Sequence, residues 1–217
     1  MRKKPNASMF QDARSMLGMD EDEFIFVSEF DDDSLESFYR NFARLEADDS
    51  MSCVPVIISS YGGDVAALVG MRDLIKSCEK PVATIALGKA MSAGAALLAA
   101  GTKELRFASP SSLIMIHEVQ SGAQGRPADL LHEADLVKAL NDQLFNLLAE
   151  DIGRPVEALL SGIRAREHAN WYLTAQQAKQ LGLVDHVEVP RLVPGGVMSN
   201  LVRTTPFRTP KKGKGRA

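Results

Sequence analysis

The chain has 217 residues, of which 45% are hydrophobic, and its formal net charge is −3. This length and apolar content fit one folded domain with tails, since domains commonly run to about 100–200 residues. No apolar run is long and uncharged enough to span a bilayer, and the slight negative charge argues against general nucleic-acid binding. Two cysteines, Cys53 and Cys78, provide neither a disulfide framework nor metal-ligand spacing, so we expect a cytoplasmic protein without metal or cofactor.

Both ends of the chain differ in composition from the middle. Residues 1–23 are polar and mixed in charge, and we expect them to form an N-terminal arm. The basic start Met1–Pro5 lacks the apolar segment that a secretory signal needs. Residues 190–217 are predicted to form loop and a flexible C-terminal tail with a basic end. The folded domain is therefore predicted over residues 24–189.

Strand-like and helix-like segments alternate through this domain. Short runs of β-branched and aromatic residues predict strands, and apolar positions three or four residues apart predict helices. The predicted strands cover residues 24–27, 54–59, 81–87, 105–107, 113–116, 171–173 and 183–189. The predicted helices cover residues 34–46, 65–76, 95–100, 128–152, 156–163 and 175–181. This alternation is typical of an α/β domain built from βαβ units, whose ligands bind beyond the carboxyl ends of the strands.

A serine lies in the turn between the predicted strand 81–87 and the following helix. Residues 88–101 read GKAMSAGAALLAAG, so Ser92 has small neighbours that let another segment approach closely. The free N–H groups of a helix start favour negative charge near such a hydroxyl. Two interpretations fit this pattern: Ser92 caps the helix, or it is a catalytic nucleophile.

Two other strand ends carry groups that suit nucleophilic chemistry. His117 is the first polar residue after the predicted strand 113–116, and imidazole is a natural base for a serine proton. Gly63 follows the strand 54–59, and its N–H together with that of Ala93 is suited to binding an oxyanion. The blander interpretation is that His117 is simply a polar residue at a strand end.

These motifs resemble those of the proteolytic subunit of the Clp protease, a self-compartmentalised serine peptidase. The resemblance covers residues 24–189 and rests on five blocks in this order: Gly62-Gly63, Gly88-x-Ala90-x-Ser92-x-Gly94-Ala95, Met115-Ile116-His117, Gly122-x-x-Gly125, and Leu173-Thr174-Ala175-x-x-Ala178-x-x-x-Gly182-Leu183-Val184-Asp185. It implies an α/β fold of the crotonase-like ββα superhelix type, with a handle helix over the long segment that ends at residue 152.

The resemblance also implies a role for individual residues. The nucleophile, the base and the two oxyanion amides would be Ser92, His117, Gly63 and Ala93. The glycine-rich loop would bind the substrate as an added β-strand through Ser121, Gly122 and Gly125.

The family resemblance implies partners as well. We expect a homo-oligomer of heptameric rings stacked in pairs through the handle helix. Its substrate would be a peptide or an unfolded protein, delivered by an ATP-dependent unfoldase of the AAA+ class. The chain has no GxxxxGK[ST] loop, so it does not hydrolyse ATP itself. No nucleic acid or membrane partner is expected.

The sequence departs from the family pattern at three positions. Asn170 stands where the family has the third catalytic residue, an Asp, and Ala169 replaces the Arg beside it that couples the two rings. Tyr61 replaces the usual Pro before the double glycine. An Asn oxygen can still accept the Nδ1–H of a catalytic histidine, and Glu167 and His168 are the alternative candidates for this position.

Several functions therefore stay open. Tyr61, Asp64 and Trp171 resemble features of Clp-like enzymes carried by bacterial viruses, including capsid-maturation proteases. The departure at Asn170 fits a weakly active or inactive structural subunit of a Clp-like complex. An acyl-CoA enzyme of the related crotonase fold is the alternative from another class, although it does not need the Ser92–His117 pair.

Overall fold

The structure is a computed structural model, and it describes residues 23–193 and 195–199. Its helices are α2 (Asp32–Ala47), α3 (Val65–Ser77), α4 (Ala93–Ala100), α5 (Pro127–Ile152), α6 (Val156–Arg164) and α7 (Ala175–Leu181). Its strands are β1 (Ile25–Val27), β2 (Val54–Ser60), β3 (Val82–Met91), β4 (Arg106–Ala108), β5 (Leu113–Ile116), β6 (Trp171–Thr174), β7 (His186–Val187), β8 (Arg191–Val193) and β9 (Gly196–Met198). The predicted N-terminal arm lies outside the described residues, apart from its last residue.

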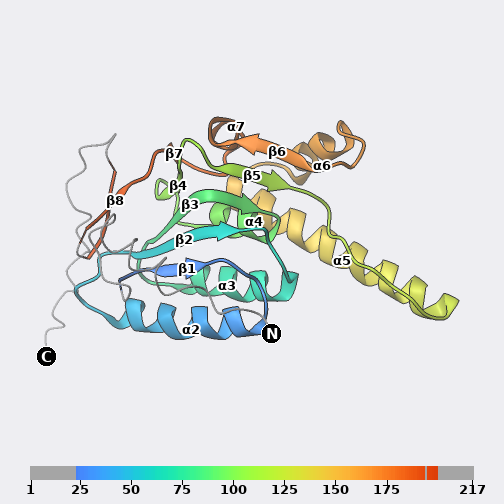
Figure 1. Ribbon diagram of the computed structural model, residues 1–217, viewed down its shortest axis with the longest axis horizontal. Helices are drawn as coiled ribbons and strands as arrows, with labels where there is room; N and C mark the ends of the chain where they lie inside the picture. Colours follow the sequence, from blue (N-terminus) through green and yellow to red (C-terminus); the bar gives the residue numbers. More distant parts are fainter. Residues whose placement is uncertain (1–22, 194, 200–217) are drawn as a thin grey trace, which may run out of the picture.

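Seven strands within the described residues form one mostly parallel sheet. The strands β1, β2, β3, β4 and β7 follow one another in parallel, and β6 is antiparallel to β5. Figure 1 shows α2 and α3 beneath the strands β1 to β3, and β5, β6, α6 and α7 at the opposite side of the domain. The predicted α/β class is therefore confirmed, and the parallel strands place their carboxyl ends along a common edge.

The third strand is longer than predicted, because it bends and continues past Leu87. Gly88 has φ +77°, a conformation that glycine adopts without a Cβ penalty. Before this bend β3 pairs with β4, and after it the residues Lys89–Met91 pair with β5. Because of the bend, β3 pairs with β4 through its first part and with β5 through its last part. Ser92 follows directly after the segment that pairs with β5.

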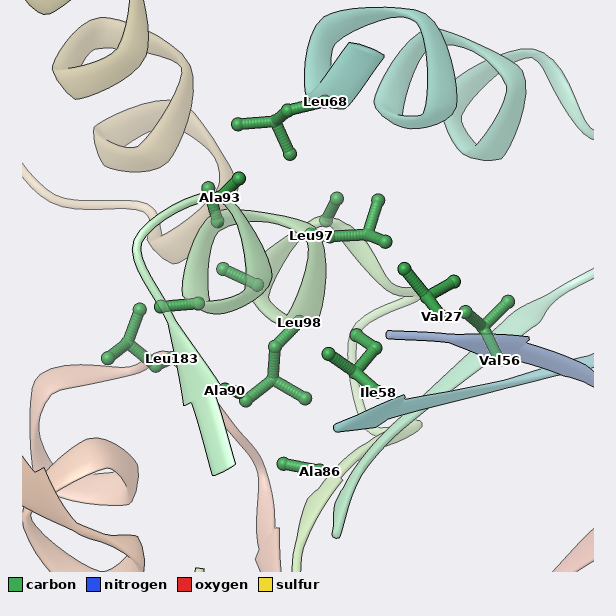
Figure 2. Close-up of a cluster of buried hydrophobic side chains, with 14 of the residues drawn as sticks. Val27, Val56, Ile58, Leu68, Ala86, Ala90, Ala93, Leu97, Leu98 and Leu183 are labelled. Carbon is green, nitrogen blue, oxygen red and sulfur yellow. The ribbon is translucent and has the colours of Figure 1, made fainter. Parts of the chain in front are cut away.

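The core lies between the sheet and its helices. All eight residues of α4 are buried, and six of them are Ala or Gly, so this helix packs closely against the strands. Figure 2 shows Leu97 and Leu98 of α4 among side chains of β1, β2 and β3, including Val27 and Ile58. Each such aliphatic side chain contributes about 1.5–3 kcal/mol when it is fully buried. The alanine-rich segment is therefore packed at the centre of the domain.

The opposite face of the sheet is covered by the C-terminal hairpin β8–β9. There Ile57, Ile85 and Phe107 form an apolar cluster with Phe24, and Leu192 of β8 packs on it. The prediction of loop and tail after residue 189 is wrong for this hairpin, because the exposed apolar sheet face offers it a packing surface. Residues 200–217, the rest of the predicted tail, lie outside the described residues.

The last predicted strand, 183–189, is also corrected. Only His186–Val187 form β7, since the parallel partner β4 is just three residues long. The preceding Asp185 is engaged differently: its carboxylate accepts from the guanidinium of Arg106 at 2.6 Å. This buried ion pair fixes the chain as it enters the sheet.

The long helix α5 buries side chains against the domain in its C-terminal half. Leu144, Phe145 and Leu148 are buried, whereas Leu131 and Leu136 are 67% and 53% exposed. Its 26 residues span about 39 Å at 1.5 Å each, and the first half projects away from the domain (Figure 1). No helix in the described part of the chain is long and apolar enough to cross a membrane.

Candidate active site

Ser92 occupies a strained turn between β3 and α4. Its φ and ψ are +54° and −119°, and a positive φ is uncommon for a residue with a Cβ. The turn is held by its backbone, because Ser92 N–H donates to the carbonyl of Met115 at 2.8 Å and Ser92 C=O accepts from Ala95 at 3.0 Å. The Ser92 side chain makes no capping hydrogen bond to α4, so the capping interpretation does not describe this serine.

A close backbone approach places the loop after β2 directly against this turn. Gly62 has φ +102°, and a Cβ at this position would lie 2.7 Å from the Cβ of Ser92 and 2.9 Å from the carbonyl oxygen of Met91. Any side chain at Gly62 would therefore push the two segments apart. The glycine brings its neighbour Gly63 to the same cavity as Ser92.

Two backbone amides border this cavity. Ala93 is the first residue of α4, so its N–H has no partner inside the helix. Neither the Ala93 nor the Gly63 amide donates a hydrogen bond within the described residues. Such amides, held in place beside a nucleophile, are suited to stabilising an oxyanion.

His117 follows β5 and lines the same cavity as Ser92, Gly63 and Ala93, which has a volume of about 450 Å³. Burial lowers the pKa of His117 below its ordinary value of 6.5, because an imidazolium is poorly solvated there. The structure has no hydrogen bond between Ser92 Oγ and His117. In unliganded sites such contacts are often loose and tighten when substrate binds.

The Nδ1 atom of His117 is buried and has no hydrogen-bond partner within the described residues. In a serine peptidase this atom is held by the third catalytic group. A buried polar atom of this kind is unusual, because its desolvation is not offset by a new bond. No described side chain therefore occupies the place of a third catalytic group beside His117 Nδ1.

The three predicted candidates for this position are engaged elsewhere or point to solvent. The amide of Asn170 donates to the Tyr172 hydroxyl at 3.3 Å, and His168 Nδ1 lies 2.8 Å from a carboxylate oxygen of Glu118. Glu167 is exposed and has φ +53°. None of them forms a hydrogen bond with His117, although pairing of β6 with β5 brings the Asn170 backbone next to the end of β5.

The loop that follows His117 forms one wall of the cavity. Ser121 lines the cavity, and its hydroxyl donates to Glu133 Oε1 of α5 at 2.5 Å. Gly122 and Gly125, which are predicted to bind substrate, belong to the same loop and do not line the cavity itself. A Cβ at Gly122 would meet no atom within 4 Å. The loop is exposed from Gln120 onward, as an edge that pairs with a peptide must be.

A second wall of the cavity, which meets the loop at the Ser121–Glu133 hydrogen bond, was not predicted from the sequence. It is a stripe on α5 whose members are Glu133, Val137, Leu140 and Leu144. Their spacing of four, three and four residues marks one face of a helix. That spacing was visible in the sequence, but nothing in it indicated that this face would border Ser92. Tyr61 and Asp64 complete the rim.

No group of three or more His, Cys, Asp or Glu side chains in the described ranges is arranged to hold a metal ion. A serine on a strained turn, a histidine at a strand end and two free amides border one cavity, and these are kinds of group that serine hydrolases use.

Comparison with known families agrees with this class. The family model described as Clp protease matches residues 6–191. The chain therefore belongs to the Clp protease family, a family of serine peptidases that form oligomeric chambers. The mostly parallel α/β sheet and the projecting helix α5 are the Clp-type fold that the sequence motifs implied.

Proposed function

We propose that this chain is a serine endopeptidase that uses Ser92 as nucleophile and His117 as base. Ser92 Oγ attacks the peptide carbonyl while His117 takes its proton, and the Gly63 and Ala93 amides bind the oxyanion. His117 then returns the proton to the leaving amine, and water hydrolyses the acyl-enzyme by the same route. The observation that carries the proposal is the convergence of these four groups, from three separate loops, on one cavity.

The lowered pKa of His117 supports its role as base. An imidazole that is neutral at pH 7 can accept the serine proton without first losing one of its own. The strained backbone of Ser92 supports the role of nucleophile, because such strain persists only where the surrounding structure enforces it.

The test is the substitution Ser92→Ala. It should abolish peptide hydrolysis and labelling by a fluorophosphonate, since it removes only the attacking oxygen. Native mass spectrometry should show unchanged assembly. Ser111→Ala is the matched control, because Ser111 is exposed and does not line the cavity, and it should keep both activities. Wild-type hydrolysis by Ser92→Ala would overturn the assignment.

A second candidate function is a weakly active or inactive subunit within a Clp-like complex. The unpartnered Nδ1 of His117 favours it, because nothing in the described chain fixes the tautomer of the imidazole or stabilises its charged form. Titration with a fluorophosphonate separates the two. A peptidase labels stoichiometrically at Ser92, whereas an inactive subunit does not label although its rings are intact.

We further propose that the active form is a ring-shaped homo-oligomer, built as two stacked heptamers and working in the cytoplasm. The exposed leucines of the projecting α5 support assembly through this helix, and the free thiols of Cys53 and Cys78 are compatible with a reducing compartment. An AAA+ unfoldase would supply unfolded protein to the chamber. Hydrolysis of a folded substrate only in the presence of such an unfoldase and ATP would support this part.

A further inference from the structure

The charged side chains that line the cavity beside Ser92 are all acidic. Its lining residues include two carboxylates, Asp64 and Glu133, and no lysine or arginine. Asp64 already accepts the N–H of Ala67 at 2.9 Å, where it caps α3. Lys89 lies outside the lining, with its Nζ 4.2 Å from the centroid of the Tyr61 ring at the rim. The charge that the cavity offers to a bound molecule is therefore negative.

Glu133 has spare capacity to bind a cation. Its Oε1 accepts from the Ser121 hydroxyl, which is one bond for a carboxylate that has about four lone-pair directions. The side chain has no lysine or arginine partner among the described ion pairs. A carboxylate that is partly buried and not neutralised attracts a positive group more strongly than one in open water.

The apolar residues Val137, Leu140 and Leu144 of α5 lie between Glu133 and the proposed nucleophile Ser92 along one face of the helix. Leu144 borders both Ser92 and His117, and Leu140, Val137 and Glu133 follow it toward the projecting end of the helix. The axial distance from Val137 to Glu133 is about 6 Å at 1.5 Å per residue. In an extended peptide, side chains on the same face are about 6.6–6.8 Å apart, two residues along the chain. The two spacings match.

From this geometry we propose that Glu133 is a specificity-determining residue that selects a basic side chain at the third residue before the bond that is cleaved, two positions before the residue next to that bond. The inference rests on the proposed function, because it takes Ser92 as the point of attack. The residue next to the cleaved bond would face the apolar part of the stripe, and the basic residue would reach Glu133 beyond Val137.

The direction of the peptide follows from the loop that forms the first wall of the cavity, residues 117–121. The chain runs from His117 to Ser121 away from the nucleophile, so an antiparallel substrate strand runs toward Ser92. Its residues before the cleaved bond then lie along Ser121 and Glu133. Antiparallel pairing is favoured slightly over parallel pairing per residue, and it is also how β6 already pairs with β5.

The experiment compares two peptides that differ at this one position, where one has lysine and the other norleucine. Norleucine keeps the apolar stem of lysine and lacks the charge. For the wild-type assembly we expect kcat/KM to be roughly tenfold higher for the lysine peptide, as expected for one charge-assisted hydrogen bond. In Glu133→Gln the ratio should fall to about one, although the Gln oxygen can still accept from Ser121.

Asp135→Asn is the matched control, because Asp135 is exposed on the same helix and does not line the cavity. It should keep the wild-type ratio. Equal kcat/KM for the two peptides with wild-type protein would overturn the inference, while continued hydrolysis of the norleucine peptide would leave the proposed function standing. If neither peptide were cleaved, the proposed function would fail. The Kd values of the two peptides, measured by fluorescence anisotropy, would still decide the role of Glu133. Tighter binding of the lysine peptide that is lost in Glu133→Gln would support the inference, and equal Kd values would overturn it.

Discussion

In the proposed mechanism, the catalytic efficiency of this chain depends on Nδ1 of His117. In a serine peptidase with a complete triad, a carboxylate at this atom orients the imidazole and stabilises the imidazolium as the serine attacks. Here the atom is buried without a partner in the described chain, and burial lowers the pKa of His117, so a base at this position would have no group to stabilise its charged form. Slow turnover with an intact nucleophile is the expected consequence.

The first prediction concerns pH. Burial lowers the pKa of His117 below 6.5, so the neutral, basic form is populated at pH values where an exposed histidine is already protonated. The acid limb of the kcat/KM profile should therefore have its midpoint below pH 6.5. The profile is measured with one peptide between about pH 4.5 and 8. A midpoint above 6.5 would mean that a negative group outside the described contacts supports His117.

The second prediction concerns Asn170. Its amide now bonds to the Tyr172 hydroxyl, yet its backbone lies beside the end of β5. Asn170→Asp introduces a carboxylate there, which favours imidazolium and so should raise the pKa of His117 and move the acid limb upward. It should also raise kcat, by at least about tenfold, since the new charge helps the transition state more than the ground state.

Two further variants serve as controls for that test. Glu167→Gln and His168→Ala should leave the profile unchanged, because Glu167 points to solvent and His168 pairs with Glu118. If Asn170→Asp changed neither kcat nor the pH profile, Asn170 would have no part in the site. Loss of activity in Glu167→Gln or His168→Ala would instead identify that residue as the third member.

At the scale of the elements, the sequence predicts best where local pattern and burial agree. The strand β2 was predicted within one residue, since its residues Val54–Ile58 are an uninterrupted apolar run and both faces of the sheet are covered. The extension of β3 past Gly88 was missed, because a glycine normally marks the end of a strand. Only the pairing of Lys89–Met91 with β5, a contact distant in sequence, keeps that segment extended.

The same limit applies to the site. Gly63, Ser92 and His117 were placed together because each follows a strand, and parallel strands end at one edge. The partner of His117 depends on which way side chains turn in the segment 165–170, and spacing along the chain contains no such information. The wall of α5 depends likewise on how a helix crosses the domain. The sequence therefore predicts which strand ends form the site, but it does not predict which side chains make contact there.

The third prediction concerns how the hairpin β8–β9 packs on the sheet. Leu192 is 6% exposed and packs on the apolar face formed by Ile57, Ile85 and Phe107. Leu192→Ala should lower the free energy of unfolding by about 2–3 kcal/mol, the cost of losing a buried side chain and leaving a cavity. Met198→Ala is the control, because Met198 is 44% exposed, and its effect should stay within about 0.5 kcal/mol. Equal urea midpoints for the two variants would show that the hairpin is not packed in solution.

At the scale of the whole molecule, the fourth prediction concerns assembly through the projecting half of α5. Leu131 and Leu136 are largely exposed on a helix that leaves its own domain, so another subunit is the natural way to bury them. Leu131→Glu with Leu136→Glu should shift the protein from rings to small species in native mass spectrometry. Lys103→Glu, on an exposed loop near the C-terminal end of α5 and away from its projecting half, should not. Intact rings in the double variant would place the interface elsewhere.

The position of Glu133 and Val137 on this projecting helix has a consequence for when the protein can act. An exposed helix segment with few tertiary contacts is only marginally stable in water, so in an isolated chain the Ser121–Glu133 hydrogen bond is one of few contacts that hold this wall of the Ser92 cavity. Packing against another subunit would fix the helix and the wall together. Newly made chains would then be latent until enough of them had accumulated to associate, and synthesis of the subunit would not by itself release a protease. The threshold for activity would be set by concentration.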